Sequence, residues 1–380
     1  MDQRRIGLAD ITLGQPLLWD VKDSTGHLLL KRGQIVHTEH QIEGLIERGL
    51  FIQRAEASAA TRAQPAAAIV PEARSVLRLI NEATKHLERL LFNLHNETDL
   101  RAKLLALAGQ IQLAAESNRD VAVATVLLNQ ASGVYPVRHC VDTAVISVLV
   151  AKELHLPPAD IAIIACAALT MNVGMLREQA HMQAKVGPLN DSEQMIVKAH
   201  PEKSVALLRQ AGIDDEVWLS YVLQHHENED GSGYPAGKGG ADTLKNAKII
   251  ALADRYCARV SARDYRPAML PNAALRDFMV GDKKNIDQQL AAVFVHVLGI
   301  YPCGSFVRLA DGETGIVTGK GESCTTPIVH AILGPRGAPL SFPIKRESSK
   351  PLHAIREVLA AETVGTPVSM HKLWGNEAKL

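Results

Sequence analysis

Apolar residues along this chain of 380 residues follow one spacing in the middle of the chain and another near each end. From about Ala73 to Val297 they recur at i, i+3, i+4 and i+7, which is the spacing of amphipathic helices. Leucine-rich runs over residues 77–91 and 104–107 predict two long helices that serve as scaffold. We therefore expect a mainly α protein with one helical domain over residues 73–300.

Both ends of the chain carry patterns that differ from the helical middle. Residues 7–54 alternate short apolar runs with turn signals and include a short helical stretch, Glu39–Arg48, which predicts a small α+β module over residues 1–55. Residues 56–72 are rich in Ala, Thr and Pro, which is typical of a linker. After residue 301, short β-branched runs separated by glycine turns predict a small β-rich module over residues 301–380.

The composition excludes several classes of partner. Lys plus Arg and Asp plus Glu number 41 each, so no excess of charge favours a nucleic acid polymer or anionic lipid. The longest apolar run, Ile161–Leu169, is too short for a membrane span, and Met1–Ile6 has no apolar segment after its basic residues. Five scattered cysteines fit reduced thiols. We expect a cytoplasmic protein without a membrane span.

The most informative segment is residues 224–235, where two adjacent histidines precede an acidic stretch and a Gly-Ser-Gly-Tyr-Pro turn. A helix is predicted over about Asp214–Asn228, and Trp218 lies on its buried stripe. His225 and His226 continue this stripe, so both imidazoles face inward, where an unpaired polar ring is unfavourable. They are either hydrogen-bonded core histidines or ligands, and the loop that follows favours ligands.

A carboxylate also falls on an apolar helix face. The helix predicted over Asn246–Val260 places Asp254 among its buried residues, and a buried carboxylate needs a cation. Arg255 or Arg259 could supply an ion pair, but both lie on other sides of the helix. A metal or ligand role for Asp254 is therefore favoured over an ion pair.

Two further histidines stand near predicted helix ends. The Asn190-x-x-Glu193 capping motif starts a helix that we expect to end at His200, with Pro201 opening the next one. A histidine at such a break can project into a cleft. His139 opens an apolar helix and carries no signal of its own.

In order and spacing, residues 120–270 resemble the HD-GYP domain, a branch of the HD phosphohydrolases that cleaves the bacterial messenger cyclic di-GMP. The segment His-His-Glu-x-x-Asp-Gly-x-Gly-Tyr-Pro is the most specific part of this resemblance. It implies an all-helical HD-type domain and metal-binding roles for a set of side chains, namely His139, His200, His225, His226 and Asp254.

The resemblance also implies a ligand element and a docking loop. Arg263 and Arg266, in a Ser-x-Arg-x-Tyr-Arg element with looser spacing at its start, correspond to residues that hold guanine or phosphate. In the family, the glycine-rich loop docks partner proteins, including diguanylate cyclase domains of the GGDEF type. Its residues here are Gly231, Gly233, Tyr234 and Pro235, and we expect Tyr234 and Pro235 to form a rigid, exposed edge.

The departures from the family concern the catalytic positions. The family's His-Asp-x-Gly-Lys is here Met171-Asn172-Val173-Gly174-Met175, and Tyr135 replaces a glutamate four residues before the first histidine. Two-metal hydrolysis needs ions about 3.5–4 Å apart with a bridging hydroxide. Asn172 offers one neutral oxygen in place of the bridging carboxylate, and Met171 offers a soft thioether. We therefore assign no catalytic residue and expect ordinary binuclear hydrolysis to be lost.

Two hypotheses for the remaining histidines stay open. His200, His225 and His226 could hold one divalent metal (Fe, Mn or Zn), or they could be packed without any metal. The leading functional hypothesis is a catalytically impaired HD-GYP-like protein that acts in cyclic di-GMP signalling as a nucleotide receptor or as a protein-docking module. An active phosphodiesterase with a one-metal or rearranged site is the alternative. A third possibility places the function in the terminal modules.

Overall fold

The computed structural model describes most of the chain after residue 74 and parts of the N-terminal region. The described residues are 3–5, 17, 20–23, 25, 27–34, 51–53, 75–129, 132–185, 187–262 and 268–380. The chain divides into two compact units, Met1–Glu72 and Ala73–Leu380. The predicted linker over residues 56–72 and the predicted helix Glu39–Arg48 lie outside the described residues.

The first unit contains a small antiparallel sheet in the order β1-β4-β2-β3. Its strands are β1 (Gln3–Arg5), β2 (Val21–Lys22), β3 (Leu28–Leu30) and β4 (Phe51–Gln53). Asp23 closes the β2–β3 turn, because its Oδ1 accepts hydrogen bonds from the backbone N–H groups of Thr25 and His27 at 2.9 and 3.0 Å. The strands expected from the alternating pattern are therefore present among the described residues.

The second unit begins with the helices that form the bulk of the molecule. They are α3 (Val76–Phe92), α4 (Leu100–Ser117), α5 (Arg119–Leu128), α6 (Tyr135–Glu153), α7 (Pro158–Thr170), α8 (Leu176–Ala184), α9 (Asp191–Gln210), α10 (Glu216–Gln224), α11 (Lys245–Val260), α12 (Pro271–Val280) and α13 (Gln288–Leu298). Short 3₁₀ turns join some of them: η2 (Leu94–Asn96), η3 (Val173–Met175) and η4 (Gly240–Asp242). The mainly α prediction for this part of the chain is confirmed.

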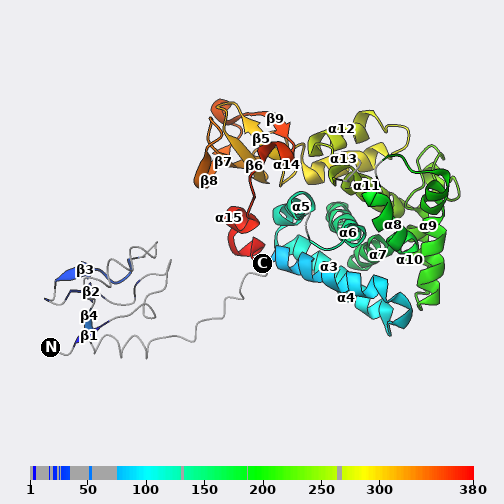
Figure 1. The fold of residues 1–380 in the computed structure, drawn as a ribbon, viewed down its shortest axis with the longest axis horizontal. Coiled ribbons are helices and arrows are strands. Elements are labelled where there is room, and N and C mark those ends of the chain that lie inside the picture. Colours follow the sequence, from blue (N-terminus) through cyan, green and yellow to red (C-terminus); the bar gives the residue numbers. More distant parts are fainter. Residues whose placement is uncertain are drawn as a thin grey trace. The chain divides into compact units, whose positions relative to one another are not determined.

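Helix α6 is the centre of this domain. Nearly all of its residues are buried, and it packs against α7 on one side and α11 on another (Figure 1). A helix that is apolar all round is expected in such a position. Because α6 carries His139 and α11 carries Asp254, this packing brings the two residues to one place from positions 115 residues apart.

Helix α9 begins as predicted and ends later than predicted. Asn190 and Glu193 form the expected capping box. The helix does not break at Pro201, because α9 continues through it to Gln210. The expectation that Pro201 starts a new helix was therefore wrong.

The C-terminal part of the second unit is an antiparallel sheet of five strands in the order β8-β7-β6-β5-β9. The strands are β5 (Phe306–Leu309), β6 (Thr314–Gly319), β7 (Ile328–Leu333), β8 (Pro339–Glu347) and β9 (Ile355–Leu359), followed by α14 (Ala361–Val364) and α15 (Met370–Trp374). The sheet lies on the side of the helices where α5 contacts β6 (Figure 1). The β-strands expected from residue 301 onward are confirmed.

One stretch of the described chain, Pro158–Gln179, is long and apolar enough to cross a membrane. It is not one continuous helix, since α7 ends at Thr170 and a 3₁₀ turn precedes α8. The protein buries 78% of its most apolar window. Because a buried core helix passes the same test of length and composition, this stretch is weak evidence for a membrane span.

Candidate metal and ligand site

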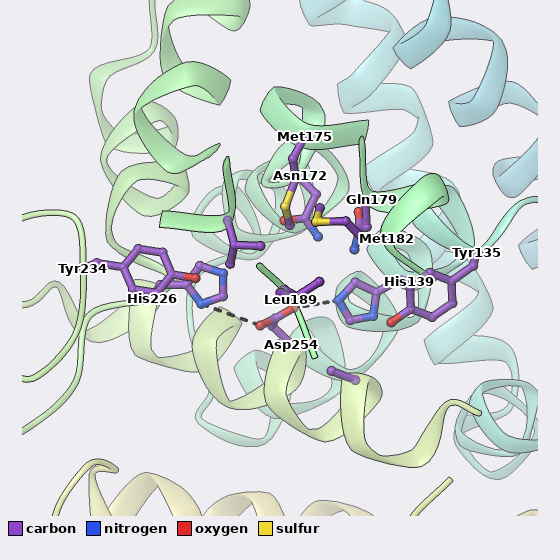
Figure 2. A pocket seen from close by; sticks show the side chains of 12 residues that line it. Tyr135, His139, Asn172, Met175, Gln179, Met182, Leu189, His226, Tyr234 and Asp254 are labelled. Atoms are coloured by element: carbon purple, nitrogen blue, oxygen red, sulfur yellow. Dashed lines mark hydrogen bonds and ion pairs between the residues drawn. The ribbon is translucent and has the colours of Figure 1, made fainter. Parts of the chain in front are cut away.

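A pocket of about 220 Å³ opens where α6, α8, α9, α11, the turn η3 and the loop after α10 meet (Figure 2). It is lined by Tyr135, His139, Asn172, Met175, Gln179, Met182, Leu189, Val197, His226, Tyr234, Asp254 and Ala258. Of the predicted metal-binding residues, His139, His226 and Asp254 therefore line one pocket.

His200 is held in place by the irregularity that Pro201 creates in α9. Proline has no backbone N–H, so the carbonyl of Val197, four residues earlier, loses its usual helical partner. The Nδ1–H of His200 donates to this carbonyl oxygen at 2.6 Å. A carbonyl only accepts hydrogen bonds, so the proton of the neutral ring resides on Nδ1 and the lone pair on Nε2 faces the site.

His225 is oriented in the same way at the end of α10. Its Nδ1–H donates at 2.6 Å to the carbonyl of Val222, one of the carbonyls that a helix leaves unpaired at its C-terminus. The Nε2 atoms of His200 and His225 are then 3.1 Å apart with both lone pairs facing each other. Two nitrogens bound at right angles to one metal ion, each at about 2.1 Å, lie about 3.0 Å apart. The pair therefore has the geometry of two ligands of a single cation.

His226 completes a group of three imidazoles. One ligand atom from each of His200, His225 and His226 lies within 4.8 Å of the other two. Tyr234 stacks on His226 with ring centroids 4.7 Å apart and lines the pocket. Tyr234 is thus half-buried against the site, and the expectation that it forms part of an exposed edge was wrong: the loop turns its ring inward, where it gains contact with the imidazole.

His139 and Asp254 form the second polar pair of the pocket (Figure 2). His139 Nε2 is 2.7 Å from Asp254 Oδ1, and His226 Nδ1 is 3.9 Å from Asp254 Oδ2. Arg255 is hydrogen-bonded to Asn228, and Arg259 forms an ion pair with Asp282. Neither arginine pairs with Asp254, which agrees with their positions on other sides of the helix. Burial would raise the pKa of Asp254, but the hydrogen bond from His139 holds this pKa well below its ordinary value.

Burial also determines the protonation of the three imidazoles. Desolvation lowers the pKa of His200 from 6.5 to about 3, with a further contribution from His225. The same cause lowers the pKa of His225 and brings that of His226 well below 6.5. Neutral imidazole is the form that binds metals, so the residues present fit a divalent metal in the neutral pH range.

The four positions that we expect to depart from the HD-GYP pattern have different surroundings. Tyr135 stacks on His139, with centroids 5.5 Å apart and planes inclined by 18°. Met171 is fully buried in the hydrophobic core, whereas Asn172 and Met175 line the pocket. Asn172 Oδ1 is buried without a hydrogen-bond partner among the described residues.

The glycine-rich loop is fastened by a buried carboxylate. Glu227 accepts hydrogen bonds from the backbone N–H groups of Ala236 at 2.8 Å and Lys238 at 2.9 Å, which draws the loop containing Gly231 and Pro235 back to the helix end. A Cβ at Gly233 would lie 2.4 Å from Asn228 N, so only glycine fits there. Arg263 and Arg266 lie outside the described residues.

Some lining residues could not be found by motif reasoning. Gln179 and Met182 enter the pocket from α8, and Leu189 from the segment before α9. An amide or thioether on a short helix has no distinctive spacing in the sequence. The buried Glu227, by contrast, directly follows the paired histidines, so its position in the sequence could have indicated that it belongs to the site.

Comparison with known proteins gives the family. Residues 78–290, more than half of the chain, match the model of the HD domain, so the chain belongs to the HD domain family. It is 30% identical over 203 residues to the cyclic di-GMP phosphodiesterase PA4108 of Pseudomonas aeruginosa, covering 53% of this chain and 49% of that protein. It is 36% identical over 130 residues to the cyclic di-GMP phosphodiesterase response regulator RpfG of Xanthomonas campestris pv. campestris, covering 33% of this chain and 34% of that protein.

A solved structure supports the fold. Bd1817, an HDGYP protein from Bdellovibrio bacteriovorus, superimposes with a TM-score of 0.52 at 16% identity, covering 78% of this chain and 99% of that chain. The chain spans half or less of the length of the two curated relatives. It is thus an HD domain protein related to the HD-GYP cyclic di-GMP phosphodiesterases.

Proposed function

We propose that this protein is a catalytically impaired HD-GYP-like protein that acts in cyclic di-GMP signalling, in the cytoplasm, as a nucleotide receptor. The observation that carries the proposal is the state of the HD pair. Met171 is packed into the hydrophobic core, and Asn172 supplies a neutral amide at the pocket. The named activity of the curated relatives supports the choice of nucleotide.

The replacements remove what binuclear hydrolysis requires. A bridging aspartate binds one metal with each anionic oxygen, and an amide oxygen cannot hold two dications together in this way. Losses even in the outer sphere of a metal site reduce affinity or activity by about 10–100-fold. Changes at Tyr135, Met171, Asn172 and Met175 together should therefore abolish binuclear turnover.

One divalent metal remains compatible with the site. His200, His225 and His226 would hold it, and Asn172 Oδ1 is a further oxygen in the pocket that His226 lines. When bound, such an ion polarises or retains a phosphate oxygen. His200 and His225 are already oriented for this by their hydrogen bonds to Val197 and Val222.

Two parts of the proposal concern segments around the pocket. Arg263 and Arg266 would anchor phosphate or a guanine edge, since a guanidinium pairs with such groups through two parallel hydrogen bonds. The loop at Gly231, Gly233 and Pro235 would dock a GGDEF-type or other signalling protein. The half-buried position of Tyr234 favours the receptor role over docking alone, because it turns the loop's aromatic ring toward the ligand pocket.

Calorimetry and elemental analysis test the proposal on one preparation purified without chelator. We expect cyclic di-GMP to bind and the metal content to be no more than one ion per chain. His225→Ala should lose the metal, and His86→Ala, at an exposed position of α3, should keep it. The absence of binding would remove the receptor role and leave docking, and two ions per chain would contradict the impaired site.

The competing function is a phosphodiesterase that works with one metal. The three facing imidazoles favour it, since they keep a metal site beside a pocket. Protein loaded with manganese or with iron under anaerobic conditions should be assayed for linear pGpG and GMP. We expect no product, and turnover that His225→Ala abolishes and His86→Ala retains would overturn the receptor proposal in favour of the enzyme.

A further inference from the structure

Two carboxamide side chains in the pocket have oxygen atoms without a donor. Asn172 Oδ1 and Gln179 Oε1 are both buried and have no hydrogen-bond partner in the described part of the chain, and both residues line the pocket. A buried acceptor without a donor is unfavourable, so such atoms usually mark a place that a ligand or ordered water completes. A half-turn of a carboxamide exchanges its oxygen with its nitrogen, so each oxygen can face a ligand that offers a donor.

Asp254 provides a third acceptor on the opposite side of the pocket (Figure 2). Its Oδ1 is bonded to His139 at 2.7 Å, whereas the distance from its Oδ2 to His226 Nδ1, 3.9 Å, is too long for a hydrogen bond. Oδ2 can therefore accept from a donor in the pocket. The acceptors thus lie on two facing walls, with a carboxylate on one wall and two amides on the other.

The charge of the lining favours a cation. Asp254 is the one carboxylate among the twelve lining residues that the structure describes, and none of the twelve is a lysine or an arginine. While the three histidines hold no metal, an anion placed here would meet a carboxylate without a compensating basic side chain, which is repulsive. A cation would be attracted by the same carboxylate.

The rest of the lining suits a short aliphatic chain. Met175, Met182 and Leu189 contribute apolar surface to the pocket, against which methylene groups are removed from water. The volume of about 220 Å³ is below the range of about 300–1,000 Å³ that is typical of drug-sized ligands. The occupant is therefore small, and it carries donors at both ends of an apolar middle.

We infer that this pocket binds a linear alkyl diamine as its diammonium cation, with one ammonium at Asp254 and the other at Asn172 and Gln179. An ammonium group carries three N–H donors, so one end can meet Asp254 Oδ2 while the other meets both amide oxygens. The methylene chain spans the distance between the two walls. The inference goes beyond the proposed function, and a bound diamine would give the pocket the positive charge that a phosphate beside it requires.

Alkyl diamines and matched single-ended molecules test the inference with the full chain. The protein is stripped of metal with chelator and dialysed into a buffer without amines. Ligand-observed NMR titrations then compare 1,3-diaminopropane, 1,4-diaminobutane and 1,5-diaminopentane with butylamine, butanoate and inorganic phosphate. We expect the best of these diamines to bind at least about tenfold more tightly than butylamine, because butylamine leaves one wall without donors. Butanoate and phosphate should not bind.

Substitutions on each wall test the two contacts separately. Asp254→Asn keeps an oxygen acceptor for His139 and removes the charge, so it should weaken the best diamine at least about tenfold. Gln179→Leu should weaken the diamine about tenfold and leave butylamine unchanged, because butylamine has no second ammonium. Asp214→Asn and Gln210→Leu, the same substitutions at exposed positions, should have no effect.

Other results would overturn the inference. Butylamine that binds as tightly as all three diamines would show that the amide wall takes no part. Diamine affinity that stays unchanged in both Asp254→Asn and Gln179→Leu would place the amine outside this pocket. If no diamine binds while cyclic di-GMP does, this inference is contradicted and the proposed receptor function stays intact.

Discussion

At the scale of single residues, the site depends on where each histidine places its proton. Pro201 removes the N–H that would bond to Val197, and His200 supplies a donor in its place. Because this side-chain donor replaces the missing backbone donor, α9 continues past Pro201, and the proton of the imidazole is fixed on Nδ1. The same hydrogen bond thus stabilises the helix and orients His200 within the group of three imidazoles.

Asp142 gives a prediction for the dependence of stability on pH. Burial raises its pKa from 3.8 to about 8, with Arg138 acting in the opposite direction. The folded protein therefore holds a proton that the unfolded chain releases between about pH 4 and pH 8, and the free energy of unfolding falls as pH rises through this window. Asp142→Asn should be more stable than the parent at pH 8 by about 2 kcal/mol or more, with the difference vanishing near pH 4.

Urea denaturation of both proteins at several pH values measures this difference. Asp214→Asn, at an exposed position before α10, is the matched control and should follow the parent at every pH. A difference that stays constant from pH 4 to pH 8 would show that Asp142 is ionised in the folded protein.

The residues of the site could be predicted from the sequence where their type conflicts with their position. Asp254 on an apolar face and the pair His225 and His226 on a buried stripe are such conflicts. In the structure His226 and Asp254 line one pocket, and the ring of His225 lies against that of His226. Gln179 could not be found, because an amide on an amphipathic helix conflicts with nothing. The end of the helix at His200 was predicted wrongly, because the rule for proline does not include a side-chain donor.

At the scale of elements, the turn η3 is pressed against α9. A Cβ on Gly174 would lie 2.5 Å from His200 O and 2.6 Å from Ser204 N, and the backbone N–H of Gly174 donates to Ser204 Oγ at 2.9 Å. This contact fixes Asn172 and Met175 relative to the histidine that α9 carries.

Gly174→Ala should therefore separate η3 from α9 and lower the free energy of unfolding by about 1–3 kcal/mol. Gly109→Ala is a matched control, because Gly109 lies within α4 with no atom within 4 Å of the added Cβ. It should raise stability by about 0.5–1 kcal/mol through helix propensity. Guanidinium denaturation of the two variants should give opposite signs, and equal signs would contradict the tight packing of η3.

The loop after α10 depends on Glu227. Its carboxylate accepts two backbone N–H groups, and Gln offers one acceptor in place of two. Glu227→Gln should speed hydrogen exchange across residues 228–240 and lower stability by about 1–2 kcal/mol. Exchange in α3 is the internal reference, and Glu202→Gln, exposed on α9, should leave the loop unchanged.

At the scale of the whole molecule, the helical domain and the C-terminal sheet form one compact unit. Residues near Leu380 pack against the helices: Arg78 of α3 donates to Leu380 O at 3.0 Å, and Asn118, the N-cap of α5, donates to Glu377. The helical and strand regions could be predicted from the sequence, because the spacing of apolar residues is a local property. It could not predict that residues near Leu380 pack against α3, because that contact joins positions about 300 residues apart.

Residues 73–380 should fold on their own, and we propose residue 72 as the boundary of the first module. Expressed alone, this piece should unfold in one cooperative transition at a melting temperature close to that of its own unit in the full chain. Deleting residues 375–380 from it should lower the melting temperature, because Ser75, Arg78 and Asn118 lose their partners. Calorimetry checks both, and aggregation of residues 73–380 would contradict the boundary.

The burial of Met171 limits how the pocket could acquire another metal ligand. Its side chain belongs to the apolar core, so a mutation to histidine would remove apolar contacts there and introduce a polar ring that needs a new partner. A histidine at this position therefore requires compensating changes in neighbouring core residues at the same time. The single variant should fold poorly, so we expect sequence changes to be tolerated more readily at the pocket lining than at this core position.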